Sequence, residues 1–144
     1  MTTNVTAEVT VNPTEDEAKV TRALKNVFPD MSVQRIPAAN GRLRLVVTGS
    51  GLQTLATLRN LIRQDRIRSA ARSILMRHTK DGLTEFCLHK QAAFAGRVSF
   101  CGSTGESPHG PISVAIRSDD PRPVIDYLAA MPGQGGFERF QRET

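Results

Sequence analysis

The chain has 144 residues, of which 39% are hydrophobic, and its formal net charge at pH 7 is +5. This size predicts one domain with its own core, and no stretch approaches the roughly 18 apolar residues of a membrane span, so no membrane partner is expected. The first residues lack the layout of a signal peptide, and Cys87 and Cys101 are too few for a disulfide scaffold, so we expect a cytoplasmic protein with reduced thiols.

The first third of the chain predicts a strand, a helix and a hairpin. Residues 5–11 alternate small apolar with polar side chains, the period of a strand with one buried face. In the helix that follows, either Pro13 takes the first position or Thr14 and Glu17 form a capping box, and Pro29 ends it. Its acidic start suits the helix dipole, without a metal or catalytic role. The apolar stripe comprises Val20, Ala23, Leu24, Val27 and Phe28.

A hairpin and a long helical region come next. Residues 31–37 and 42–48 are predicted strands, and Asn40-Gly41 between them indicates a type I′ turn. The Gly-Ser-Gly sequence at 49–51 precedes the helix, a context in which backbone N–H groups cradle phosphate. The P-loop lysine pattern is absent, so a plain turn is favoured and a phosphate-ligand enzyme is a distant alternative. Gln64-Asp65 either breaks the helical region, with Asp65 as an N-cap, or lies inside one long helix. The apolar stripes of the two parts are Leu55, Leu58 and Ile62, and then Ile67, Ala70, Ala71, Ile74 and Leu75.

The last part of the chain predicts three strands and a helix. Asp81-Gly82 indicates a turn, and residues 83–89, 97–101 and 112–117 are the predicted strands. The last helix begins at Asp119-Asp120-Pro121 and closes at Pro132-Gly133. We expect residues 1–132 to form a single domain and 133–144 a flexible tail. The order β-α-β-β-α(α)-β-β-β-α predicts an α+β fold, with helices packed on one mixed, largely antiparallel sheet.

The residues that carry chemistry do not form a convincing catalytic or metal site. A zinc site could be assembled from Cys87, His89, Cys101 and His109, but it would lack the close ligand pairs that are normal in structural zinc sites. We therefore expect free thiols and no metal. A Cys–His nucleophile has no supporting motif, and the acidic residues offer no pair for acid–base catalysis. His78 is expected as a packed or helix-ending imidazole. The sequence therefore predicts a non-enzymatic protein without a cofactor.

Basic residues are concentrated in the middle of the chain. Residues 35–97 hold twelve basic and three acidic residues, and residues 59–80 hold seven basic residues with Asp65 as their one acid. Arginines beside an apolar stripe often only cover it with their methylenes, but this imbalance favours binding of an anion. The candidate contacts are Arg42, Arg44, Arg59, Arg63, Arg66, Arg68, Arg72, Arg77, Lys80, Lys90 and Arg97.

The aromatic content narrows the choice of anion. The chain has no Trp, one Tyr and six Phe, and Phe94 is the one plausible exposed stacker, since Tyr127 lies far in sequence from the basic zone. Binders of single strands stack bases on exposed aromatic rings, so this composition favours structured RNA. The leading hypothesis is an RNA-binding module that contacts phosphates through its arginine-rich helices. The alternative is a protein-interaction or self-assembly module, a homo-oligomer included, whose basic zone docks an acidic partner.

Six segments resemble a small, uncharacterised archaeal family grouped as RNA-binding. They are Pro13-Thr14-Glu15-Asp16, Val27-Phe28-Pro29-Asp30, Arg63-Gln64-Asp65-Arg66-Ile67 with Ala71-Arg72, the stretch from His89 to Val98, Gly110-Pro111-Ile112, and Ser118-Asp119-Asp120-Pro121. The resemblance covers about residues 5 to 131, and residues 90–94 are its most specific part. It implies RNA as a partner, similarity to predicted exosome-associated proteins, and a fold resembling that of the ribosomal protein that holds the 5S RNA. Exosome- or ribosome-associated proteins are the further partners that it implies.

Overall fold

A single six-stranded sheet forms the framework of the protein. The computed structural model describes residues 3–101 and 110–130. The strands are β1 (Thr3–Val11), β2 (Val33–Pro37), β3 (Leu43–Ser50), β4 (Thr79–Lys80), β5 (Leu83–Leu88) and β6 (Ile112–Ser118). Their order is β2-β3-β1-β6-β5-β4, and every described pair is antiparallel. The α+β class is confirmed, and the sheet is antiparallel throughout, where a mixed sheet was predicted.

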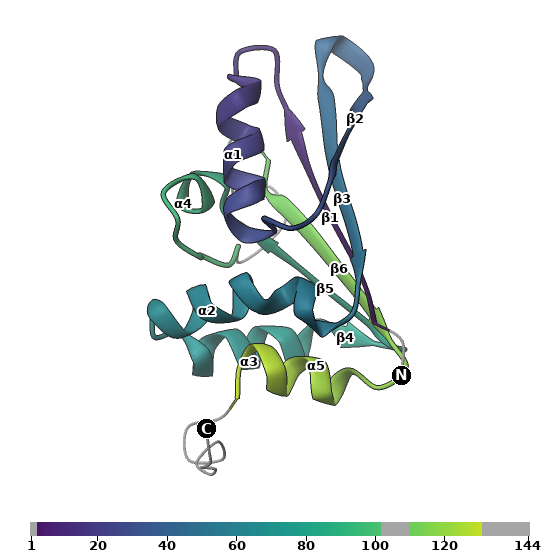
Figure 1. The fold of residues 1–144 in the computed structure, drawn as a ribbon, viewed down its shortest axis with the longest axis vertical. Helices are drawn as coiled ribbons and strands as arrows, with labels where there is room; N and C mark the ends of the chain where they lie inside the picture. The colour runs from purple at the N-terminus through teal and green to yellow at the C-terminus, as the bar shows by residue number, and fades with distance from the viewer. Residues whose placement is uncertain (1–2, 102–109, 131–144) are drawn as a thin grey trace.

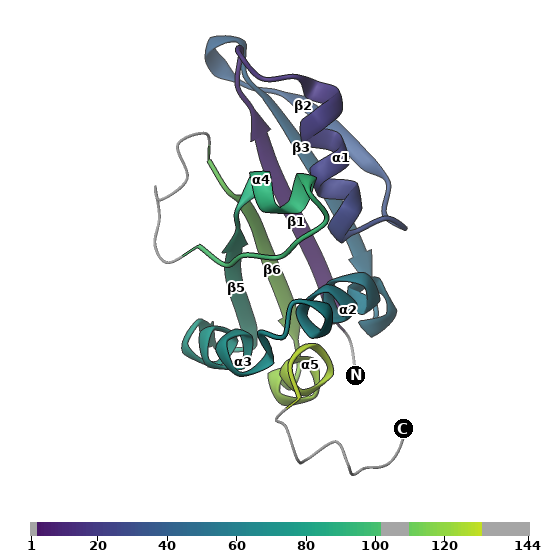
Figure 2. The same cartoon turned by 90° about the vertical axis from the view of Figure 1, so that its left-hand side faces the viewer.

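The helices form one layer on one face of this sheet. They are α1 (Glu17–Val27), α2 (Ala56–Gln64), α3 (Arg68–Arg77), α4 (Lys90–Phe94) and α5 (Pro121–Leu128), with 3-10 turns at Ala39–Gly41 and Leu52–Leu55. Figures 1 and 2 show α1 and α4 over one end of the sheet and α2, α3 and α5 over the other. In the described part of the chain, no helix covers the opposite face. None of these helices is long and apolar enough to cross a membrane.

The core lies between the sheet and the helical layer. Ala7 on β1 pairs with Val47 on β3 and Val114 on β6, and all three side chains are buried. Strand alternation places these residues on one face, where they meet the helix stripes. Leu24 of α1 and Ile62 of α2 are both fully buried, as the helical periodicity predicts. The stripe of α3 is less regular, because its Ala70 is exposed.

Helix boundaries follow the capping chemistry, with one correction. Asp16 caps α1 by accepting a hydrogen bond from the backbone N–H of Ala18, so neither Pro13 in the first position nor the Thr14–Glu17 capping box is correct. The reason is that Glu15 turns back and accepts from the backbone N–H of Asn12 at 2.9 Å. Helix α5 begins at Asp119-Asp120-Pro121, as predicted: Asp120 is the N-cap and Pro121 is the first helical residue. This helix ends at Leu128 with Ala129 as its C-cap, earlier than the predicted end at Pro132-Gly133, because the backbone of Ala129 is not helical. The predicted tail lies outside the described residues.

Two segments near the end of the sheet differ from the prediction. Residues 97–101 are not a strand: they form one isolated bridge, from Phe100 to Leu88, because the chain first makes α4 and a loop. The short strand β4 and helix α4 were not predicted. Cys101 donates its backbone N–H to the carbonyl of Cys87, and the two cysteines are not joined by a disulfide. No group of three metal-binding side chains occurs within residues 3–101 and 110–130, and His109 lies outside them.

The turns match the sequence signals. Asn40 and Gly41 both have positive φ, of 62° and 75°, as a type I′ turn requires. Asp81 and Gly82, with φ of 54° and 80°, form the same kind of turn between β4 and β5. The likeness to the ribosomal protein that holds the 5S RNA stays a prediction.

We predict that Gly82→Ala destabilises the protein more than Gly96→Ala. Both glycines have positive φ, which costs other residues roughly 1–2 kcal/mol. A Cβ on Gly82 would also lie 2.8 Å from the carbonyl oxygen of Ser118, whereas a Cβ on Gly96 would meet nothing within 4 Å. Urea unfolding of the two variants measures the difference in stability. Equal losses would contradict the close approach of Gly82 to Ser118 on β6.

Candidate functional site

The junction between α2 and α3 is closed by its own backbone. The N–H of Ile67 donates to the carbonyl of Ile62 at 3.2 Å, and that of Arg66 to the carbonyl of Arg63 at 3.1 Å. This pair of bonds is a Schellman motif, which needs a left-handed residue directly after the helix cap. That residue is Arg66, with φ of 57°, at a position where glycine is usual. The predicted break at Gln64-Asp65 is thus confirmed.

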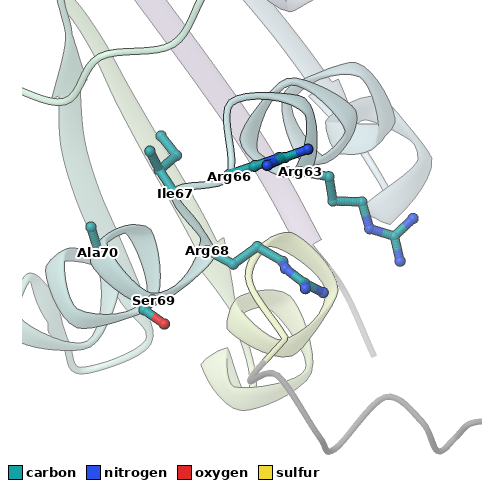
Figure 3. A pocket seen from close by; sticks show the side chains of 6 residues that line it. All are labelled: Arg63, Arg66, Ile67, Arg68, Ser69 and Ala70. Atoms are coloured by element: carbon teal, nitrogen blue, oxygen red, sulfur yellow. The ribbon is translucent and has the colours of Figure 1, made fainter.

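A hollow of about 750 Å³ opens at this junction. Its lining consists of Arg63, Arg66, Ile67, Arg68, Ser69 and Ala70. Figure 3 shows the three arginine side chains extending to one side of the connecting segment, with Ile67 and Ala70 on the other. None of these three arginines forms an ion pair or a side-chain hydrogen bond with another residue that the structure describes. Three unneutralised guanidinium groups therefore gather at one place.

Asp65 fixes the neighbouring loop and does not cap α3. Its carboxylate accepts from Arg97 Nε at 2.9 Å and from the backbone N–H of Val98 at 3.0 Å, and its side chain is only 7% exposed. The N-cap position of α3 belongs to Ile67, which provides no capping side chain. Asp65 thus holds the loop after α4 against the α2–α3 junction through its bonds to Val98 and to the largely exposed Arg97.

Two of the predicted arginines hold α5 in place. The guanidinium carbon of Arg59 lies 4.6 Å from the centre of the Tyr127 ring, and its Nε is buried without a hydrogen-bond partner in the described structure. Arg72 donates to Asp126 Oδ1 at 2.6 Å and to the carbonyl of Ala129. These contacts bring Tyr127 to the basic zone despite its distance in sequence. They give Arg59 and Arg72 a structural role in docking α5.

The remaining predicted residues are dispersed over the molecule. Arg44 pairs with Glu8 at 2.9 Å, and Arg42 lies in the β2–β3 connection at the end of the sheet away from α2 and α3 (Figure 1). Arg77 is at the last residue of α3 and donates to the carbonyl of Ser73 in its own helix. Lys80 follows on β4. Since α3 has ten residues, Arg77 is about 14 Å along the helix from Arg68.

Lys90 is a buried structural residue. It is 5% exposed, and its Nζ donates to the carbonyl of Thr10 at 2.8 Å and to Glu15 Oε1 at 3.0 Å. Burial alone would raise the pKa of the Glu15 carboxyl, but hydrogen bonds from Asn12 and Lys90 outweigh it and hold that pKa below its ordinary value. Lys90 thus joins α4 to the end of β1 and to the connection between β1 and α1, so it is not available to a ligand in this conformation.

The glycine loop before α2 is a turn. Gly49 and Ser50 belong to β3, and the N–H of Gly51 donates to the carbonyl of Thr3 at 2.8 Å. A 3-10 turn follows, and the N–H of Thr54 is bonded back to Gly51. Two of the backbone donors that would cradle a phosphate, those of Gly51 and Thr54, are thus already used, which favours the plain turn over a nucleotide loop.

Ile67, Ser69 and Ala70 line the hollow and were missed as site residues. Ile67 and Ala70 match the apolar stripe of their helix and were therefore assigned to the core. The signal that could have found them is the predicted helix break, since residues directly after a break lie beside the end of the previous helix.

The fold and this surface define an α+β protein with an open antiparallel sheet and a cationic hollow in its helical layer. A family model described as RNA binding matches residues 4–118. The chain belongs to this RNA-binding family. The description of the family is a binding function and not a catalytic one.

Its relatives match over nearly the whole chain. A UPF0201 protein of Pyrobaculum aerophilum is 40% identical over 132 residues, which are 91% of this chain and 92% of that protein. One from Aeropyrum pernix is 40% identical over 143 residues, 96% of this chain and 94% of that protein. The crystal structure of a UPF0201 protein from Methanococcus jannaschii matches with a TM-score of 0.79 and 31% identity, over 92% of this chain and 96% of that chain.

We predict that Lys90→Met destabilises the protein at neutral pH by about 2–3 kcal/mol, because Glu15 loses its partner. This is somewhat less than the cost of removing one partner of a fully buried ion pair. The lowered pKa of Glu15 gives stability that is complete above its unfolded pKa and is lost as the pH falls through its folded pKa. The difference in free energy of unfolding between parent and variant should therefore become smaller as the pH falls from about 7 to about 3. Denaturant unfolding at both pH values measures it; a constant gap would contradict the ion pair.

We predict that Arg66→Gly raises the free energy of unfolding by about 0.5 kcal/mol. Removing the strain of the left-handed backbone at Arg66 adds roughly 1–2 kcal/mol to the free energy of unfolding. The greater freedom of glycine in the unfolded chain offsets about half of this gain. The matched control is Arg63→Gly, inside the last turn of α2, which should lose about 1 kcal/mol. Chemical denaturation compares them, and a loss of stability in Arg66→Gly equal to that of the control would disprove the strain.

Proposed function

We propose that the protein is a non-enzymatic RNA-binding module that contacts RNA phosphates at the α2–α3 junction. The observation that carries the proposal is the group of three arginines around one hollow, which have no acidic partner in the part of the chain that the structure describes. Guanidinium groups suit phosphate because their planar fork donates two parallel hydrogen bonds. Membership of an RNA-binding family supports RNA as the anion.

The surface that we assign is smaller than the basic zone of the sequence. It consists of Arg63, Arg66 and Arg68. Arg97 is not counted, because its guanidinium is paired with Asp65. Arg59, Arg72 and Lys90 are left out, because their polar or charged groups already serve the fold. Arg77 and Lys80 would extend the surface only for an RNA long enough to reach the far end of α3.

Structured RNA is the ligand class that this arrangement favours. The three arginines start from two helix ends that a hydrogen-bonded turn holds together, so their spacing is restricted. Phosphates of a folded RNA also have restricted spacing, whereas a flexible strand must lose entropy to match it. Phe94 is 40% exposed, but it lies on α4, and Tyr127 is covered by Arg59 on one side. An exosome- or ribosome-associated partner, which the resemblance implies, would bring this surface to folded RNA.

We predict that changing Arg63, Arg66 and Arg68 together to Gln weakens binding of a hairpin RNA and reduces its salt dependence. Each lost phosphate contact should lower the slope of log affinity against log salt by about 0.9 on a duplex. The matched control replaces three other exposed basic residues, also with Gln: Lys19, Arg22 and Arg117. Both variants lose the same charge, and a fluorescence-anisotropy titration at several salt concentrations compares them.

Equal weakening in the two variants would show that only net charge matters and would contradict a site at the junction. If the parent binds no RNA but binds an acidic polypeptide or associates with itself, the protein is an interaction module and the proposal is wrong. Analytical ultracentrifugation at low and high salt detects the self-association.

A further inference from the structure

The hollow is larger than a phosphate group requires. Its volume of about 750 Å³ falls within the range of roughly 300–1,000 Å³ that is typical of sites for small organic ligands. A phosphate held by the arginines would fill only the cationic side. The other side would still present Ile67 and Ala70 to water.

The two sides of the hollow differ in chemistry. On the cationic side, three positive charges exceed the single negative charge of one phosphodiester group. A guanidinium plane that is not used for phosphate can stack on a nucleobase. On the other side, Ala70 is exposed and Ile67 is half-buried, so both leave apolar surface for an organic group. Ser69 adds a hydroxyl that can hydrogen-bond a sugar.

We propose that this hollow binds one unpaired nucleotide, with its phosphate on the arginines and its base or sugar against Ile67 and Ala70. The inference rests on the proposed RNA-binding function and specifies what the RNA must present there. A nucleotide inside a duplex does not fit, because its base faces are covered by the neighbouring pairs. A bulged or terminal nucleotide of a folded RNA and a free mononucleotide share the required chemistry, and the experiments below distinguish them.

The first experiment compares small probes. Adenosine 5′-monophosphate, ribose 5-phosphate and inorganic phosphate are titrated separately at equal ionic strength, and the backbone amide signals of residues 67–70 are followed by NMR. We expect all three probes to shift these signals. Adenosine monophosphate should bind at least about tenfold more tightly than phosphate, which corresponds to roughly 1.4 kcal/mol of additional binding free energy. Equal affinities would reduce the hollow to an anion site and overturn the inference.

Two variants of α3 provide a matched pair. Ala70→Glu places a negative charge in the hollow, and Ser73→Glu places one on an exposed residue of the same helix that does not line it. An acid in the first turn of a helix is favourable, so Ala70→Glu should fold. We expect it to weaken adenosine monophosphate about tenfold or more, and Ser73→Glu to change the affinity less than about twofold. Equal effects would place the ligand elsewhere.

The second experiment tests the source of the nucleotide. Two hairpin RNAs of equal charge, one fully paired and one with a single bulged nucleotide, are compared by anisotropy at fixed salt. Tighter binding of the bulged hairpin, lost in Ala70→Glu and kept in Ser73→Glu, supports the inference. If both hairpins bind alike and adenosine monophosphate does not bind, the RNA-binding function stands and this inference fails. If adenosine monophosphate binds and neither hairpin does, the hollow takes a free mononucleotide and not a nucleotide of an RNA. The proposed RNA-binding function then fails as well.

Discussion

The turn between α2 and α3 is the constraint on which the rest of the helical layer depends. Its two backbone hydrogen bonds close the end of α2, and the Asp65 carboxylate ties the turn to the backbone of Val98 and to Arg97. The Asp65 side chain is only 7% exposed, so its carboxylate gives up most of its contact with water and depends on these two bonds. One residue thus positions α3, the loop after α4, and the arginines on both sides of the turn.

Tertiary contacts select which basic residues remain available to a ligand. The sequence places twelve basic residues between positions 35 and 97, which suggests one continuous surface. The fold assigns several of them to other tasks: Lys90 supports α4 from inside, and Arg59 and Arg72 hold α5. What remains at the junction is a group of three arginines that form no ion pair with any acidic residue that the structure describes, since Asp65 is paired with Arg97. A small unpaired cluster gives a more localised field than a large zone of paired charges.

Periodicity and capping patterns were sufficient to predict most of the fold. The stripes of α1 and α2, the type I′ turns and the Asp120 cap depend on residues close in sequence, so the sequence alone reveals them. Helix α4 has five residues, too few for a helical period, and its Lys90 is buried only because Glu15, far away in the chain, meets it. The site was predicted in part for the same reason. Basic composition located the region, but whether an arginine is paired depends on contacts such as Arg72 with Asp126.

Arg66 connects stability with binding. In a left-handed position after a helix, glycine fits without strain. An arginine there costs free energy that the fold does not recover through any ion pair or side-chain hydrogen bond of Arg66 among the described residues. The same backbone conformation directs the Arg66 side chain to the side of the turn where Arg63 and Arg68 extend (Figure 3). Glycine would form the turn with less strain but would remove one of the three charges from the hollow. The strain is therefore best understood as the cost of placing a third guanidinium group where the ends of two helices meet.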